Sequence, residues 1–284
     1  MKTRALVELA SIKDHDLFAE LSSGIDAVID NATSLWEDAC SLWEVGRRRG
    51  YRVLMAAAEE EAAKALILVD AARCPRKPPK RLARHLERFY DHLAKGIYAA
   101  VCDWSPANCG DLIRYIEPER RSLYLDGLTG ADWIFPNQIL RQREEAIYVD
   151  FVRKGDTRGW AVPKYGDDPL LRHGLPMAPS SLSLAMAMQE AGMTSPDALA
   201  VIANIWRPIE PTPDMAWTSL RALNIRTIEE IERNGLMSTL DDERRPLATI
   251  ANEWTYPLHS VDLSMIKVKR AALGDVQRIW TVDG

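Results

Sequence analysis

The chain has 284 residues, of which 47% are hydrophobic and 27% charged, a composition typical of a globular protein with a substantial core. Its formal net charge of −5 excludes a general electrostatic attraction to nucleic acid or to anionic membranes, so either partner would have to be bound by a local patch.

Targeting and redox features point to the cytoplasm. Charges interrupt the N-terminal stretch 1–18, which is typical of neither a signal peptide nor a transit peptide. No apolar run approaches the ~18 residues that a membrane span needs. The four cysteines lack C-x-x-C spacing, so we expect free thiols without a disulfide or a zinc site. We therefore expect a cytoplasmic protein with no membrane contact, no cofactor and no metal.

Helical periodicity dominates the first half of the chain. Apolar residues at steps of three and four predict a helix over 22–46 that ends at Gly46. A second predicted helix covers 51–73 and stops before the prolines of "CPRKPP". A third predicted helix runs over 82–102 and a fourth over 109–125, and "EEAIYVDFV" is typical of a helix end or a strand.

In the second half, residues 153–179 are rich in Gly, Pro and charged residues, which predicts a long surface loop, and short helices follow. We predict helices over 180–192 and 195–206, the latter with Ser195 as its N-cap. Thr212-Pro213-Asp214 predicts the start of another helix, and a capping box from Thr227 to Glu230 predicts one more. The C-terminal tail can include a strand.

These elements predict a mainly α protein. Helices joined by short turns pack most readily as antiparallel neighbours. We expect an antiparallel helical bundle over 1–165 and a mostly helical C-terminal extension over 166–284.

The second predicted helix carries charges at the centre of an otherwise apolar sequence, namely Glu59, Glu60, Glu61 and Lys64. A buried carboxylate without a partner is strongly destabilising. Glu60 and Lys64 can pair at a spacing of four residues. Glu61 has no such partner, so we expect it to face a basic group on a neighbouring helix.

The third predicted helix supplies basic groups on one stripe, at steps of four and three: Arg81, His85, Arg88, His92 and Lys95. Residues 73–95 contain eight Lys or Arg and two acidic residues, a local charge of +6. His92 is the candidate catalyst, because Arg88 and Lys95 flank it on this stripe. We predict that Glu60, Glu61 and Lys64 face His92 and Lys95 across a helix–helix contact. His85 alone is more typical of a surface histidine, and we group it with Arg81 and Arg84 as candidate binding residues.

Three readings of the charged centre remain open at this point. The run "EEEAAK" is a good helix former and could be a solvated face, or the charges could form a buried structural network, or they could form a functional site. Glu-x-x-His pairs of a di-iron bundle, a phosphate loop, a Rossmann glycine fingerprint and a G-x-S-x-G elbow are all absent from the sequence.

Four motifs in order resemble the AbiV-type branch of the HEPN superfamily over residues 25–165. The matching positions are Asn31 and Ala32; Glu60, Glu61 and Lys64; His92 and Lys95; and Arg143 with Tyr148, Val149 and Asp150. The resemblance does not extend past about residue 210.

The resemblance implies a helical HEPN bundle that forms a homodimer and a role in bacterial abortive infection, in which host translation is stopped or RNA is damaged. It adds Arg143 and Tyr148 to the candidate binding residues, beside Glu60. Catalytic HEPN ribonucleases have an Arg, four to six intervening residues, and a His. This sequence departs from that spacing, with three residues between Arg88 and His92 and seven between Arg84 and His92.

Two classes of function follow. As an enzyme, the protein would cleave RNA without metal, with His92 as acid and base, Arg88 or Lys95 stabilising the phosphorane, and Glu61 and Lys64 in the same site. As a binding module, its charged groove would recognise RNA or a phage or host protein without cutting it. A nucleotide-sensing bundle that signals through the C-terminal extension is a third hypothesis.

Overall fold

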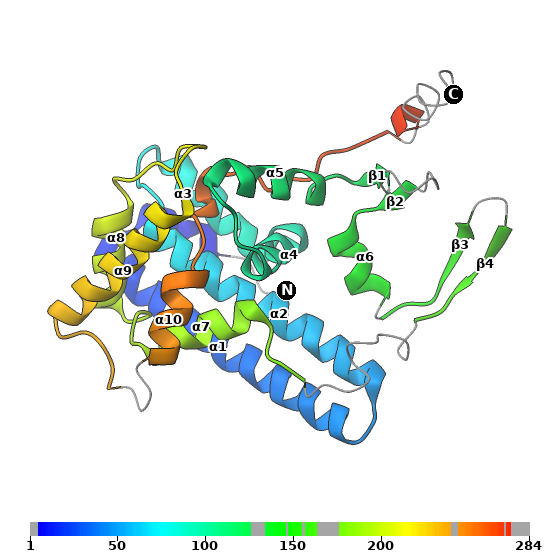
Figure 1. Ribbon diagram of the computed structural model, residues 1–284, viewed down its shortest axis with the longest axis horizontal. Helices are drawn as coiled ribbons and strands as arrows, with labels where there is room; N and C mark the ends of the chain where they lie inside the picture. The colour runs from blue at the N-terminus through cyan, green and yellow to red at the C-terminus, as the bar shows by residue number, and fades with distance from the viewer. Residues whose placement is uncertain are drawn as a thin grey trace.

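The computed structural model describes residues 5–125, 134–145, 147–154, 157–163, 176–239, 244–269 and 271–273. Helices dominate this part of the chain, as predicted (Figure 1). The α-helices are α1 (Asp14–Glu44), α2 (Arg48–Arg73), α3 (Pro79–Glu87), α4 (His92–Ala100), α5 (Cys109–Glu119), α6 (Gln138–Glu145), α7 (Ser180–Glu190), α8 (Pro196–Trp206), α9 (Trp217–Arg233) and α10 (Arg244–Glu253). The 3-10 helices are η1 (Leu6–Ser11), η2 (Arg88–Tyr90), η3 (Val101–Asp103) and η5 (Leu258–Ser260).

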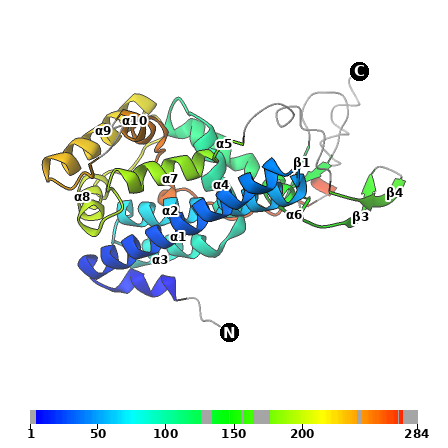
Figure 2. The same ribbon diagram turned by 90° about the horizontal axis from the view of Figure 1, so that it is seen from below.

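Two antiparallel strand pairs complete the described fold. Strand β1 (Leu123–Leu125) pairs with β2 (Ile134–Pro136), and β3 (Asp150–Lys154) pairs with β4 (Thr157–Ala161). The second pair is a hairpin that projects away from the helices (Figures 1 and 2). This hairpin lies partly within the surface loop predicted over 153–179.

The two longest helices, α1 and α2, lie antiparallel and form the centre of the bundle (Figure 1). The turn between them needs Gly46, whose φ of 73° lies in the left-handed region that side chains disfavour. Both helices begin earlier than predicted, because periodicity locates the apolar face better than the helix ends.

The predicted third helix over 82–102 was wrong, because the chain breaks it in two. The Asp91 carboxylate accepts hydrogen bonds from the backbone amides of Leu93 (2.8 Å) and Ala94 (3.1 Å). This N-cap ends the preceding turn η2 and starts α4 at His92. The predicted basic stripe assumes one continuous helix, so the break also separates its members.

The two helix starts predicted at 212–214 and 227–230 were also wrong, because α9 is continuous from Trp217 to Arg233. Thr227 lies inside it, where its hydroxyl donates to the carbonyl of Leu223 at 2.8 Å and accepts from the indole of Trp206 at 3.0 Å. Ser195 caps α8 and α7 spans most of 180–192, as predicted. The helix predicted over 109–125 ends at Glu119, because Leu123–Leu125 pair with β2 as a strand. The four cysteines are free.

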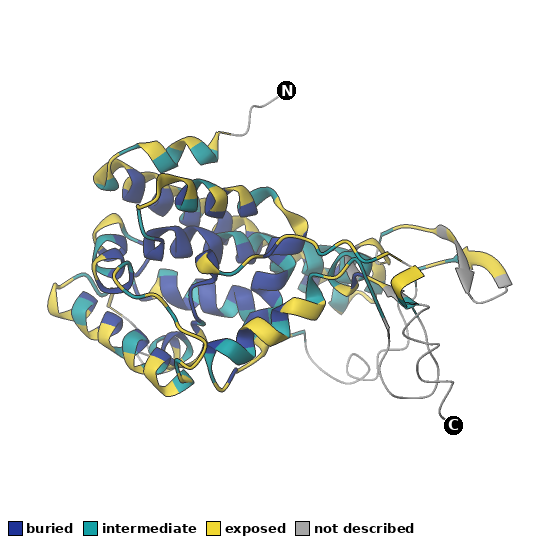
Figure 3. Cartoon of the chain, turned by 90° about the horizontal axis from the view of Figure 1, so that it is seen from above, coloured by how far each residue is buried: buried dark blue, intermediate teal, exposed yellow. Residues whose placement is uncertain are grey.

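One hydrophobic core includes residues from both halves of the chain. Leu21 of α1, Ile67 of α2, Leu199 of α8 and Ile250 of α10 belong to the same buried cluster. The deeply buried residues concentrate in the helical body, while the β3–β4 hairpin is largely exposed (Figure 3). The division expected between residues 165 and 166 lies outside the described residues and stays a prediction. Within the described part, no helix combines the length and apolarity needed to cross a membrane.

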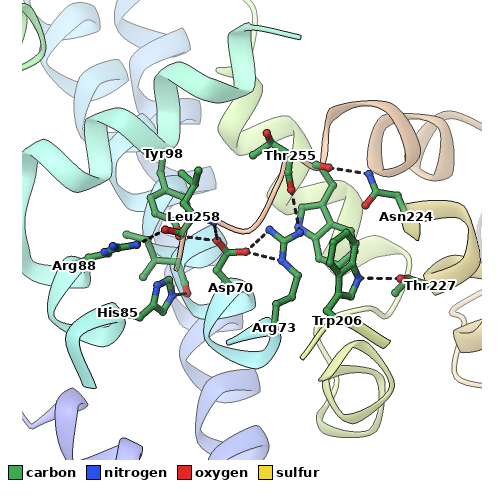
Figure 4. A network of polar contacts seen from close by, with 12 residues as sticks. Asp70, Arg73, His85, Arg88, Tyr98, Trp206, Asn224, Thr227, Thr255 and Leu258 are labelled. Carbon is green, nitrogen blue, oxygen red and sulfur yellow. Dashed lines mark hydrogen bonds and ion pairs between the residues drawn. The ribbon is translucent and has the colours of Figure 1, made fainter. Parts of the chain in front are cut away.

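A buried polar network joins α2 to the C-terminal segment 255–261 (Figure 4). Asp70 forms an ion pair with Arg73, accepts a hydrogen bond from Tyr98 Oη at 2.7 Å and accepts another from the Leu258 amide at 2.9 Å. Arg73 donates to the carbonyl of Thr255 at 3.0 Å. Burial raises the pKa of Asp70, but the charge of Arg73, the nearby His85 and His259 and the hydrogen bond from Tyr98 together outweigh it and lower the pKa overall.

Two buried residues of α3 and η2 extend this network to the same C-terminal segment. Arg88 donates to the carbonyl of Leu258 at 2.7 Å and to that of Val261. His85 Nε2 donates to the carbonyl of Ile67 at 2.7 Å, and its ring lies 6.4 Å from that of His259 between centroids. Burial lowers the pKa of His85 to about 4 and that of His259 to about 3, so both imidazoles are neutral near pH 7.

We expect Arg73→Ala to lower the free energy of unfolding by about 3–5 kcal/mol, because it leaves the buried Asp70 without its counter-ion. The matched control is Arg114→Ala in the exposed Asp111–Arg114 pair, which has the same spacing of three residues and should cost no more than about 1 kcal/mol. Urea unfolding followed by circular dichroism measures both. Equal losses for the two variants would contradict a structural role for the buried pair.

Candidate functional site

A half-buried polar cluster on α2 reaches both α1 and α4. Its residues form two neighbouring sets of contacts, one between α2 and α4 and one between α2 and α1: Glu60, His92 and Lys95; and Glu61, Lys64 and Asn31. Five of them are predicted site residues, and Asn31 is a motif position.

Glu60 of α2 connects to α4 through two contacts. Its Oε2 accepts from His92 Nδ1 at 2.9 Å and from Lys95 Nζ at 2.9 Å. Burial raises the pKa of Glu60, but the hydrogen bonds and charges of Lys95 and His92 outweigh it and lower the pKa overall. The predicted contact with His92 and Lys95 is therefore confirmed for Glu60, whereas Glu61 contacts Lys64 and Asn31.

The contact with Glu60 fixes how His92 can act. A carboxylate only accepts hydrogen bonds, so Nδ1 of His92 carries a proton and Nε2 is left for a substrate or water. The His92 side chain is 45% exposed, whereas that of Lys95 is only 6% exposed. His92 is thus the member of this trio that a ligand can reach.

Glu61 forms a second set of contacts. Lys64 is its ion-pair partner at a spacing of three residues, and Asn31 Nδ2 of α1 donates to Glu61 Oε2 at 3.1 Å. The expectation that Glu61 lacks a partner on its own helix was wrong, because a spacing of three residues also brings helical side chains together. Lys64 Nζ also lies 5.1 Å from the centre of the Phe89 ring.

The predicted basic stripe does not gather around His92. Arg81 forms an ion pair with Glu210 at 2.5 Å, and Arg84 is exposed on α3. His85 is fully buried rather than a surface histidine, and Arg88 is buried against the C-terminal segment. The physical reason is the break at Asp91, after which α4 begins with its own orientation.

The two remaining binding candidates lie on and after α6. Tyr148 is exposed between α6 and β3. Arg143 belongs to α6, but its side chain lies outside the described residues. Their roles stay predictions.

Glu59 directly precedes the cluster on α2, and no role was predicted for it. Burial first, and then the charges of Asp103 and Glu60, raise its pKa to about 7. Its place in the run "EEE" marks it as polar, but the proximity of Asp103 depends on how η3 packs against α2 and has no signal in the sequence. Among the described residues, no group of three or more His, Cys, Asp or Glu side chains is arranged to hold a metal ion.

We expect Glu59→Gln to stabilise the protein above neutral pH. The folded state binds the Glu59 proton more tightly than the unfolded chain does, so stability falls as the pH rises from the ordinary pKa of 4.5 through about 7. The variant should gain about 1–3 kcal/mol at pH 8 and little at pH 4. Urea unfolding at both pH values measures this, with the exposed Glu87→Gln as control, and a gain that does not depend on pH would contradict it.

Comparison with known proteins places the chain in a family. The AbiV model of the HEPN domains matches residues 20–169, which is more than half of the chain. Searches of the curated proteins and of the solved structures found no match. The matched range includes most of α1 and all of α2 and α4, and therefore every residue of the polar cluster. The chain belongs to the AbiV family, the abortive-infection branch of the HEPN proteins.

Proposed function

We propose that this abortive-infection protein stops growth by cleaving RNA without a metal ion, with His92 as the acid–base residue. The observation that supports the proposal is the pair formed by Glu60 and His92. The carboxylate holds Nδ1 of a half-exposed imidazole, and this contact does not engage Nε2. An imidazole held in this way can exchange a proton with a bound substrate near neutral pH.

In the proposed reaction, Nε2 of His92 takes the proton of a ribose 2′-hydroxyl. The 2′-oxygen then attacks the adjacent phosphorus and the bond from phosphorus to the 5′-oxygen breaks. An imidazolium returns a proton to this leaving oxygen, and the products are a 2′,3′-cyclic phosphate and a 5′-hydroxyl. In a homodimer the second imidazole would be His92 of the other chain.

The rest of the polar cluster would position His92 and balance charge. Glu60 orients the imidazole, and Lys95 adds positive charge beside the same carboxylate. Glu61 and Lys64 tie α2 to α1 through Asn31. Arg88 takes no part in the proposed reaction, because its guanidinium is committed to two backbone carbonyls.

A binding module is the second candidate, supported by the way the cations are paired. Glu60 and Glu61 already neutralise Lys95 and Lys64. A phosphate entering the cluster would have to compete with both carboxylates. A polar partner that offers both hydrogen-bond donors and acceptors, such as a protein surface, would not have to displace the carboxylates from the lysines.

We expect His92→Ala to abolish growth arrest by the induced protein and to slow cleavage of tRNA in EDTA by about 10²–10⁴-fold, because the acid–base group is lost. The fold should remain intact, since the side chain is half exposed. The matched control is His15→Ala, which removes a histidine that is 95% exposed on α1 and should change neither result.

Glu61→Ala separates the two candidates. It removes the contacts to Asn31 and Lys64 and should lower stability by about 1 kcal/mol as well as activity. If His92→Ala still arrests growth while Glu61→Ala does not, the cluster is a binding or structural surface and the ribonuclease proposal is wrong.

We also expect a homodimer formed through the N-terminal bundle. Half-buried apolar side chains of α1 and α2 outside the turn that joins them, such as Leu35 and Met55, leave surface that a second copy could cover. Light scattering at micromolar concentration should give twice the chain mass of 32.0 kDa. A mass of one chain would contradict the dimer and the sharing of His92 between chains.

A further inference from the structure

One end of the molecule combines two protruding elements outside the polar cluster. The α1–α2 turn and the β3–β4 hairpin lie at the same end of the long axis, opposite α8 and α9 (Figures 1 and 2). A hydrogen bond of 3.0 Å from Arg49 Nη2 to the Ile147 carbonyl joins them at the base of the hairpin. We call the α1–α2 turn, residues 147–149 and the hairpin the end surface.

The hairpin presents exposed aromatic rings. Phe151 and Trp160 are paired in register, so both side chains lie on one face, with their ring centroids 5.1 Å apart. They are 59% and 70% exposed, and Tyr148, Val149 and Val162 are exposed beside them. Large rings held outward on a two-stranded ribbon contribute little to the core and are typical of a binding surface.

The turn supplies positive charge. Residues 44–52 contain four arginines, Arg47, Arg48, Arg49 and Arg52, and one acidic residue, Glu44, for a net charge of +3. Residues 141–162 contain five basic and four acidic residues, and exposed Arg158 lies on the hairpin. In a chain of net charge −5, this end is therefore locally basic.

An open hollow of about 490 Å³, whose lining surface is apolar, lies at this turn. Its lining residues are Leu42, Val53, Leu54, Gly50, Arg47, Arg48 and Arg49. The Arg48 guanidinium stacks on the Trp43 ring at 3.3 Å.

We propose that the end surface binds single-stranded RNA. Exposed aromatic rings stack on unpaired bases, and nearby arginines neutralise the phosphates between them. Duplex RNA offers phosphates but no free base faces, so the rings select single strands. This inference rests on the proposed function in taking RNA as the substrate, and it assigns the surface that holds the strand apart from the residues that cut it.

Binding is measured by the fluorescence anisotropy of a labelled twelve-nucleotide uridine RNA, with the His92→Ala protein used throughout so that no strand is cut. Phe151→Ala combined with Trp160→Ala should raise the Kd by about tenfold or more, because stacking is lost. Arg47→Ala combined with Arg158→Ala should raise the Kd and make the dependence of log Kd on log salt shallower by about 0.7 for each cation removed.

The matched control is Arg233→Ala, which removes an arginine that is 67% exposed on α9 at the opposite end of the molecule and should leave the Kd unchanged. Thermal unfolding checks that each variant is folded, and Arg47→Glu with Arg158→Glu replaces the aromatic pair if that variant is unstable.

Three outcomes would overturn the inference. The first is an unchanged Kd in both end-surface variants. The second is equal affinity for a duplex of the same length. The third is loss of the dimer rather than of RNA binding, which would make this surface an interface between copies. Binding that depends on the hairpin in a protein that never cuts RNA would overturn only the proposed ribonuclease. Cleavage that is unaffected by the hairpin variants would overturn only this surface.

Discussion

The buried ion pair between Asp70 and Arg73 is the contact on which the rest of this structure depends. Both residues lie on α2, but their other partners are the Tyr98 hydroxyl of α4, the Leu258 amide and the Thr255 carbonyl. Charges in an apolar core are tolerated only where each has such partners, so the network allows one arrangement of α2, α4 and the C-terminal segment. The Arg73 guanidinium also lies 4.4 Å from the centre of the Trp254 ring, which extends the same contact toward α10.

The cap at Asp91 then divides the histidines of this region into two kinds. His85, before the break, is buried against the Ile67 carbonyl with a pKa lowered to about 4 by burial. His92, after the break, is half exposed on a carboxylate of another helix. Two residues that a continuous helix would place on one stripe therefore have different environments. Burial keeps the first neutral and structural, while exposure makes the second available to a ligand.

The sequence predicted the helical class, the main helices and the contact of Glu60 with His92 and Lys95. Both apolar periodicity and charged residues in an apolar helix can be recognised in the amino-acid sequence alone. It did not predict the break at Asp91, since an aspartate between apolar turns also fits the outer face of a continuous helix. Nor did it predict that Thr227 lies inside α9, where its hydroxyl meets Trp206 from another helix. The raised pKa of Glu59 depends first on burial and then on the charge of Asp103, forty-four residues away, and both are set by packing.

Arg88 and His92 are separated by three residues and have separate partners in the structure, which fits their departure from the spacing of catalytic HEPN ribonucleases. The arginine nearest in sequence, Arg88, holds the carbonyls of Leu258 and Val261 and so serves the C-terminal segment. His92 takes its orientation from Glu60 on α2 instead of from an arginine on its own helix. Its geometry therefore depends on how α2 packs against α4, and the Asp70–Tyr98 hydrogen bond joins the same two helices about three turns further along α2 and about two turns further along α4. An acid–base role for His92 would in this way require the whole folded chain, including segments outside the range that defines the family.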